Sequence, residues 1–278
     1  MLAQNRPPPQ RTGMDALASL RLQLEWGADE ALAALPIDRT LPAGRRREVP
    51  APAPAASSPV ARRQPAPAAQ TPTPPVRRAQ EVAAAAESVD ALRAALAGFD
   101  GCALAATATN LVFADGNPSS GLMLVGEGPG EEEDRTGLPF VGRSGQLLDR
   151  MLGSIGLDRQ SCLITNLIPW RPPGNRNPTD AEVLVCLPFL LRHIALVRPR
   201  RLVLLGALAA RAVLGGSAGI TRLRGRWHEA TIPGLPAKLP ALPMLHPAYL
   251  LRNAGAKRDA WADLRLLRRT LDADLTQV

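Results

Sequence analysis

The chain has 278 residues, and 33 Lys and Arg against 25 Asp and Glu give a formal net charge of +8. It contains 3 cysteines, too few for a disulfide framework, so we expect a protein of the reducing cytoplasm. No apolar run approaches the ~18–20 residues that span a bilayer, and the first residues lack the apolar stretch of a secretory signal. These features exclude membrane, collagen-like and secreted disulfide-rich proteins. The basic balance permits nucleic acid as a partner.

The first 80 residues are predicted to lack a core of their own. Apolar positions over 14–35 indicate a short helical segment within residues 1–40, which either docks on the main domain or binds a protein partner. Residues 41–80 form a predicted disordered linker rich in Pro, Ala and Arg, in which positions 50–75 include 9 prolines and 8 alanines. The arginines of this linker either only keep it solvated or weakly attract DNA phosphates.

Residues 81–278 are predicted to form one α/β domain that begins with an Ala-rich helix at 81–97. Strand-like and helical patterns then alternate, with strands expected at 122–125, 162–166, 201–205 and 239–245 and helices at 144–155, 180–196 (interrupted at Pro188), 207–214 and 257–272. This alternation is typical of a three-layer α/β/α sandwich with a central, mainly parallel sheet. Ligands of such sheets bind at the carboxyl ends of strands, so we expect a site near 126–130, Asn166 and His246.

The glycine-rich turn GEGPGEEED, residues 126–134, lacks the spacing of a phosphate-binding loop, and four acidic residues follow it directly. Its glycines instead let backbone amides near Gly128 approach a flat ligand. Glu127, held between two glycines, is the first candidate for a catalytic carboxylate and Glu133 the second. Glu131 and Glu132 suit the N-terminus of a helix.

Three more residues suit recognition of a planar ligand. Phe140 either offers a flat face or is an ordinary core side chain. Asn166 either ends its strand in a turn or reads an N–H beside a C=O, because its amide combines an acceptor with two donors. His246 is one of 3 histidines and is either structural or a hydrogen-bond donor.

Two basic segments follow. The segment ITRLRGRW interleaves Arg224 and Arg226 with an aromatic residue, a pattern typical either of a solvated surface or of phosphate contacts. In HPAYLLR, the apolar Leu250 and Leu251 and the cationic Arg252 follow the histidine. Apolar side chains on an exposed tip suit a wedge between stacked bases.

Six motifs occur in order over residues 99–270: GEGPGEEED, GLPFVGRSGQLLDRML, ITN, RPPGNRNPT, ITRLRGRW and HPAYLLR. Together they closely resemble the family 4 uracil-DNA glycosylases, a bacterial and archaeal branch of the uracil-DNA glycosylase superfamily. The resemblance implies a base-excision-repair enzyme that acts on uracil-containing DNA, hydrolyses the N-glycosidic bond and leaves an abasic site. We expect a monomer, since such a site serves one flipped base.

The resemblance also implies roles for individual residues. Phe140 would stack on the flipped uracil, Asn166 would pair with its N3–H and O4, and His246 would donate to O2. Glu127, or secondarily Glu133, would position the attacking water. The remaining implied contacts are a backbone amide near Gly128 to uracil, and Arg224, Arg226, Leu250, Leu251 and Arg252 to DNA.

Members of the family bind an iron–sulfur cluster through four cysteines, in the pattern C-x2-C followed by C-x15-C. The matching positions here are Phe99, Cys102, Trp170 and Cys186. Two thiolates cannot hold a standard [4Fe–4S] cluster. We therefore expect no cofactor and no metal, with the two aromatic residues filling the space. An incomplete cluster with unusual ligands is the alternative.

Two further interpretations stay open. One is a DNA-binding module that has kept the fold and lost catalysis. The other, compatible with an enzyme, is an interaction protein recruited to a repair or replication complex through residues 1–40. The joint presence of Glu127, Phe140, Asn166 and His246 favours the enzyme.

Overall fold

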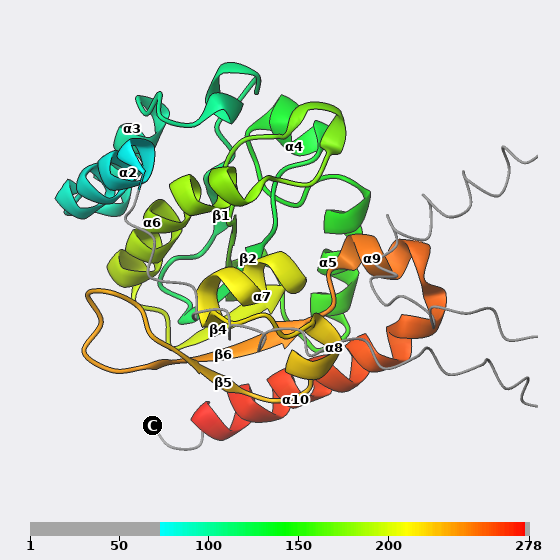
Figure 1. The fold of residues 1–278 in the computed structure, drawn as a ribbon. Helices are drawn as coiled ribbons and strands as arrows, with labels where there is room; N and C mark the ends of the chain where they lie inside the picture. Colours follow the sequence, from blue (N-terminus) through cyan, green and yellow to red (C-terminus); the bar gives the residue numbers. More distant parts are fainter. Residues whose placement is uncertain (1–72, 276–278) are drawn as a thin grey trace, which may run out of the picture. The chain divides into compact units, whose positions relative to one another are not determined.

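The computed structural model describes residues 73–275, so the predicted helical segment within 1–40 and the linker up to residue 72 lie outside the described residues. A six-stranded sheet with the strand order β1-β3-β2-β4-β6-β5 lies between two layers of helices (Figure 1). Its strands are β1 (Ala114–Gly116), β2 (Leu122–Gly126), β3 (Leu163–Asn166), β4 (Arg201–Leu205), β5 (His228–Ala230) and β6 (Leu239–Met244). The four inner strands pair in parallel and the two edge strands antiparallel, which confirms the predicted mainly parallel sheet.

Successive side chains of a strand point to opposite faces of the sheet and so to different helical layers. One layer consists of α2 (Pro74–Ala85), α3 (Val89–Ala97), α6 (Asp180–Val197) and α7 (Ala207–Leu214). The other layer consists of α5 (Arg143–Gly153), α9 (Pro247–Arg252) and α10 (Lys257–Leu275). The predicted three-layer sandwich is confirmed. Within residues 73–275, no helix is long and apolar enough to span a bilayer.

The predicted single helix at 81–97 is in fact two helices. Ser88 separates α2 from α3 and caps α3, because its hydroxyl oxygen accepts the backbone N–H of Ala91 at 3.1 Å. The first of the two helices begins at Pro74, inside the predicted linker, where proline suits the first helical turn. Val76 and Ala79 are buried against the main core, so the folded domain starts before residue 81.

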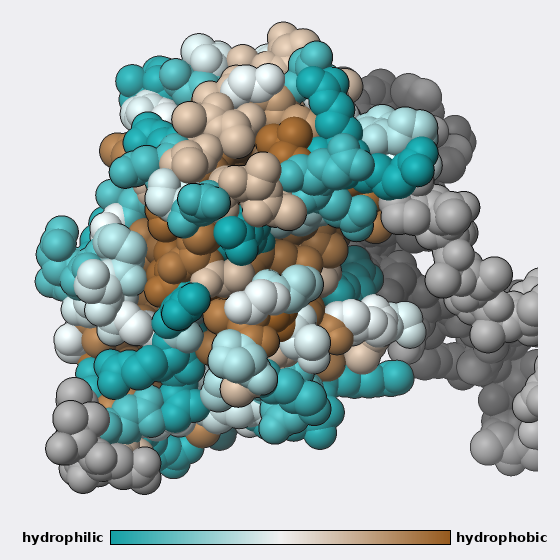
Figure 2. Space-filling view, turned by 90° about the vertical axis from the view of Figure 1, so that its left-hand side faces the viewer, coloured by the Kyte–Doolittle hydropathy of each residue, from teal (hydrophilic) through white to brown (hydrophobic). Residues whose placement is uncertain are grey.

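The predicted interruption at Pro188 is wrong, because α6 continues through this residue. Apolar packing compensates for the backbone hydrogen bond that proline removes. The helix is apolar on nearly all sides, and Leu184 on its outer face is 52% exposed. Figure 2 shows apolar side chains gathered in the middle of the face over which α2, α3 and α6 lie.

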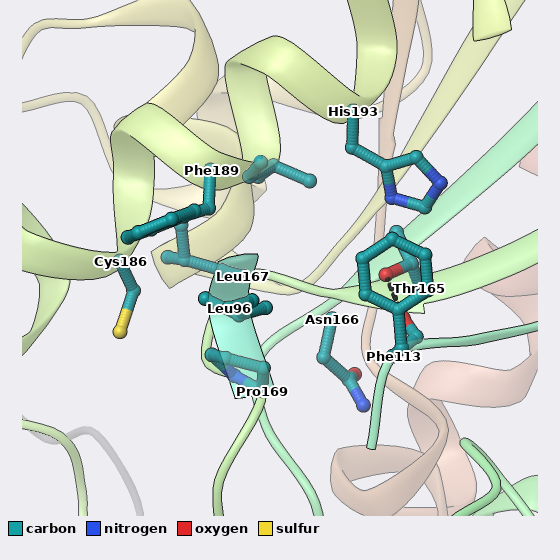
Figure 3. A pocket seen from close by; sticks show the side chains of 10 residues that line it. Leu96, Phe113, Thr165, Asn166, Leu167, Pro169, Cys186, Phe189 and His193 are labelled. Carbon is teal, nitrogen blue, oxygen red and sulfur yellow. Dashed lines mark hydrogen bonds between the residues drawn. The ribbon is translucent and has the colours of Figure 1, made fainter. Parts of the chain in front are cut away.

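His193 of α6 lines a small cavity on the α6 side of β3 (Figure 3). Its ring stacks on that of Phe113 with centroids 4.5 Å apart, and Nε2 has no hydrogen-bond partner among the described residues. The accessible space is about 20 Å³, enough for about one water molecule and too small for a nucleobase. The cavity is therefore not a substrate pocket.

Burial lowers the pKa of His193 to about 4, from an ordinary value of 6.5. The unfolded chain binds more protons than the folded chain between these two values. The contribution of neutral His193 to the free energy of unfolding is therefore fully present above pH 6.5 and is lost as the pH falls towards 4. We expect this residue alone to remove about 2 kcal/mol of stability between pH 7 and pH 5. In the His193→Phe variant, Tm should fall less steeply as the pH is lowered from 7 to 5. If Tm fell as steeply as in the wild-type protein, the imidazole would not be buried in its neutral form.

Candidate nucleobase site

The site lies where β2, β3 and β6 end at the carboxyl edge of the sheet. Gly126 and Asn166 are register partners on neighbouring parallel strands, and His246 follows β6. A Cβ atom on Gly126 would overlap both the Asn166 amide oxygen and the Phe140 ring, so any larger residue would displace one of these two side chains. The rings of Phe140 and His246 have centroids 5.6 Å apart. Residues that are 120 positions apart in the chain thus meet at one point, as the strand pattern predicted.

Two polar atoms of this site are buried without a partner. They are Oδ1 of Asn166 and Nε2 of His246, which have no hydrogen bond to any described residue. Most buried polar atoms in proteins are paired, because an unpaired one costs free energy. One acceptor and one ring nitrogen left open beside the same aromatic ring favour a planar ligand that presents both a donor and an acceptor.

The tautomer of His246 follows from its position as the N-cap of α9. Its Nδ1 accepts the backbone N–H of Ala248 at 3.1 Å, so the proton of a neutral ring is on Nε2. Burial, aided by the nearby charge of Arg252, lowers the pKa of this histidine to about 4. At neutral pH the unpartnered Nε2–H is therefore an uncharged hydrogen-bond donor.

Glu127 lies in the turn after β2 and is half-buried. Burial raises the pKa of its carboxyl group, and the charges of Arg211 and Arg252 oppose this shift. A raised pKa makes the carboxylate a better base towards water. Arg211 of α7 was not predicted, because no local sequence pattern distinguishes it; only the packing of α7 brings its charge near Glu127.

Gly128 is half-buried in the same turn as Glu127. A Cβ atom added to this glycine would lie 3.4 Å from the Cβ atom of Ile168.

Glu133, the second candidate for the catalytic carboxylate, instead joins two loops. It belongs to α4 (Glu131–Thr136) and is 6% exposed. One carboxylate oxygen accepts the N–H of Gly130 at 3.0 Å, and the other accepts the N–H of Gly142 at 2.8 Å. Since both oxygens accept backbone N–H groups, this side chain joins the glycine-rich turn before α4 to the loop that follows Phe140.

The segment after His246 forms the short helix α9 rather than an exposed loop tip, and this separates its two leucines. Leu250 is 1% exposed and packs into the core, so the expectation that it is exposed is wrong. Leu251 is 40% exposed and Arg252 is exposed beside it. Neighbouring residues of a helix point about 100° apart, which is why only one leucine of the pair faces solvent.

Arg224 and Arg226, two of the three arginines predicted to contact DNA, differ in their surroundings. Arg224 donates from Nε and Nη2 to the two carboxylate oxygens of buried Asp263, at 2.9 and 2.8 Å. Its charge is thus neutralised inside the protein, which does not fit the predicted phosphate contact. Arg226 is exposed, two residues further along the chain. In the RPPGNRNPT segment, Arg176 is likewise paired with Glu182, at 2.6 Å.

Comparison with known proteins agrees with this geometry. The model of the uracil-DNA glycosylase superfamily matches residues 113–265. A type-4 uracil-DNA glycosylase of Thermotoga maritima is 44% identical over 153 residues, which are 55% of this chain and 77% of that protein. One from Pyrobaculum aerophilum is 37% identical over 171 residues, 60% of this chain and 86% of that protein. A type-5 enzyme of the same organism is 37% identical over 114 residues, 36% of this chain and 50% of that protein. The chain therefore belongs to the uracil-DNA glycosylase superfamily.

Proposed function

We propose that this protein is a uracil-DNA glycosylase that removes uracil from DNA and leaves an abasic site for base-excision repair. The observation that carries the proposal is the pair of unpartnered atoms, Oδ1 of Asn166 and Nε2 of His246, beside the ring of Phe140. Uracil presents an N3–H donor between two carbonyl acceptors on one flat ring, so it satisfies both atoms at once. Cytosine has an acceptor at N3 and a donor at C4, so it mismatches the Asn166 amide.

The chemistry follows from these groups. A base inside a duplex is out of reach, so the nucleotide is first flipped out of the stack. Asn166 accepts from N3–H and donates to O4, and Phe140 stacks on the ring. As the N-glycosidic bond breaks, negative charge grows on uracil O2, and the neutral Nε2–H of His246 stabilises it mainly in the transition state. Glu127 orients water towards the sugar carbon and accepts its proton as the new C–O bond forms, and the departing uracil keeps the electron pair of the broken N-glycosidic bond. All these residues come from one chain, so we propose a monomer as the acting form.

The residues at the family's cluster positions do not fit an iron–sulfur cluster, and we propose that this chain holds none. Phe99 and Trp170 are buried at 3% and 4% exposure, and the Phe99 ring packs edge-on against Phe189 at 4.9 Å. The neighbouring thiol of Cys186 lowers the pKa of Cys102 to about 7, and the thiol of Cys102 together with burial raises the pKa of Cys186. Within residues 73–275 no group of three or more His, Cys, Asp or Glu side chains could hold a metal.

One experiment tests both proposals. Purified full-length protein, first analysed for iron and visible absorption, is incubated in EDTA with an oligonucleotide that contains one uracil, and abasic sites are then cleaved with alkali. We expect strand cleavage only after alkali, from protein without iron. Binding without cleavage would favour the non-catalytic DNA-binding module. Stoichiometric iron with a brown chromophore would overturn the absence of a cluster and leave the activity intact.

Leu251→Ala is expected to lower uracil excision from duplex DNA by about tenfold, with a smaller loss on single-stranded DNA. The exposed leucine of α9 fills the space that the flipped nucleotide leaves, and only a duplex has a continuous stack to hold open. Leu184→Ala is the matched control, because this leucine is also exposed but lies on α6. Equal losses on both DNA forms would contradict the wedge.

A further inference from the structure

The backbone of Phe140 has an unusual conformation. Its φ is 56°, in the left-handed region that bulky residues seldom occupy. Such a conformation persists only where surrounding contacts impose it. The loop also packs directly on α5, because a Cβ atom on Gly145 would overlap the carbonyl group of Phe140. The ring that faces Asn166 and His246 is therefore carried by a backbone that needs external support.

Arg159 provides that support from a distant part of the chain. Its guanidinium donates to the backbone carbonyl of Pro139 at 3.1 Å and to that of Phe140. The same guanidinium is held by Asp115 of β1 at 2.6 Å and by Asp149 of α5 at 3.0 Å. Its five N–H donors in a fixed plane allow four acceptors to be bound together, which the ammonium of a lysine does not match.

The loop is thus held on both sides. Glu133 binds the N–H of Gly142, after the phenylalanine, and Arg159 binds the carbonyls of Pro139 and Phe140. The bonds of Glu133 go to the backbone N–H groups of Gly130 and Gly142, and those of Arg159 go to two carbonyls and two carboxylates, so none of them reaches the unpartnered atoms of the site. Each acts on a ligand only through the loop that carries the ring.

We propose that Arg159 is a positioning residue for uracil recognition, which holds the backbone of Phe140 so that its ring faces the space beside Asn166 and His246. This inference rests on the proposed function. Without the guanidinium, the two carbonyls lose their donor and the backbone at residue 140 relaxes towards negative φ. The ring then leaves its place beside the base, while Asn166 and His246 stay on their strand end and helix cap.

A double-mutant cycle tests this role. Arg159→Ala and Phe140→Ala are each expected to lower kcat/KM for uracil excision by about tenfold, the size of one base-stacking contact. In the Phe140→Ala background, adding Arg159→Ala should change kcat/KM by no more than about twofold, because the ring it positions is already absent. Arg159→Lys should give an intermediate loss and replaces the alanine variant in the cycle if that variant does not fold.

Arg201→Ala is the matched control. Arg201 is 21% exposed and binds Asp274 with two hydrogen bonds, at 2.7 and 2.5 Å, but it starts β4 at the opposite end from the site. It should lower Tm comparably to Arg159→Ala and leave kcat/KM unchanged. Independent, multiplicative losses in the cycle, or full activity of Arg159→Ala, would overturn the positioning role. Absence of uracil excision by the wild-type protein would instead overturn the proposed function.

Discussion

Replacing His246 by alanine is expected to lower kcat for uracil excision by about 10²- to 10³-fold, the usual effect of losing one donor to a developing negative charge. The donor is unusually well defined here. Nδ1 is occupied by the N–H of Ala248, Nε2 is buried without a partner, and burial holds the pKa at about 4. An uncharged donor in a site shielded from water strengthens its bond as charge grows on O2, so the loss should fall on kcat rather than on KM.

Single-turnover excision with saturating enzyme measures this effect, because product release does not contribute. His228→Ala is the control: its ring is bonded to the carbonyl of Leu223 at 2.8 Å and it lies on the edge strand β5. We expect little change in this variant. If His246→Ala raised KM and left kcat unaltered, the histidine would bind the ground state and the transition state equally, and the catalytic role would be wrong.

Asn166→Ala should lower kcat/KM for uracil excision by about 10- to 100-fold, because a bidentate base contact is worth ~1–3 kcal/mol. The loss should be the same on single-stranded and on duplex DNA, since the amide binds the flipped base and not the neighbouring bases of the strand. The reason for a large effect is burial: the side chain is 5% exposed, so water cannot replace the missing partner of uracil.

Thr165→Val is the matched control for this substitution. Thr165 precedes Asn166 on β3, is 3% exposed, and donates its hydroxyl to the carbonyl of Phe113 at 2.6 Å towards the α6 layer. We expect this variant to lose stability and to keep its kcat/KM. Equal losses of activity in both variants would mean that β3, and not the asparagine amide, controls the reaction. Excision by Asn166→Ala at the wild-type rate would show that uracil is read elsewhere.

The α/β alternation in the sequence was sufficient to predict the layers of the fold and the edge of the sheet where the site lies. Short, mainly apolar runs at 122–125, 162–166, 201–205 and 239–245, which end at or are followed by glycine, asparagine or histidine, identify buried parallel strands and their carboxyl ends. The two edge strands escaped prediction, because β1 and β5 have three residues each and no continuous apolar run. The division between α2 and α3 was missed because alanine favours helix throughout this stretch and the cap at Ser88 interrupts it only locally.

The roles of charged side chains depended on the tertiary structure. Arg224 looked like a surface cation, yet it is paired with Asp263, which lies 39 residues further along the chain. Glu133 was the second candidate for the carboxylate that positions water, yet the N–H of Gly142, from another loop, occupies one of its oxygens. Local patterns contain no information about such partners, because ion pairs and carboxylate–backbone bonds depend on distances in space.

The sequence by itself determined the family, the parallel centre of the sheet and the residues that we propose to face uracil, since these depend on local periodicity and on motifs with fixed order. Only the tertiary structure decided which atoms of those groups are free. The proton of His246 is on Nε2 because α9 supplies an N–H to Nδ1, and Leu251 rather than Leu250 faces solvent because of the helical phase. The left-handed backbone of Phe140 likewise depends on Arg159, which no local pattern connects to it. Burial and hydrogen-bond partners arise from the packing of distant segments, which is the physical reason why they are absent from the sequence pattern.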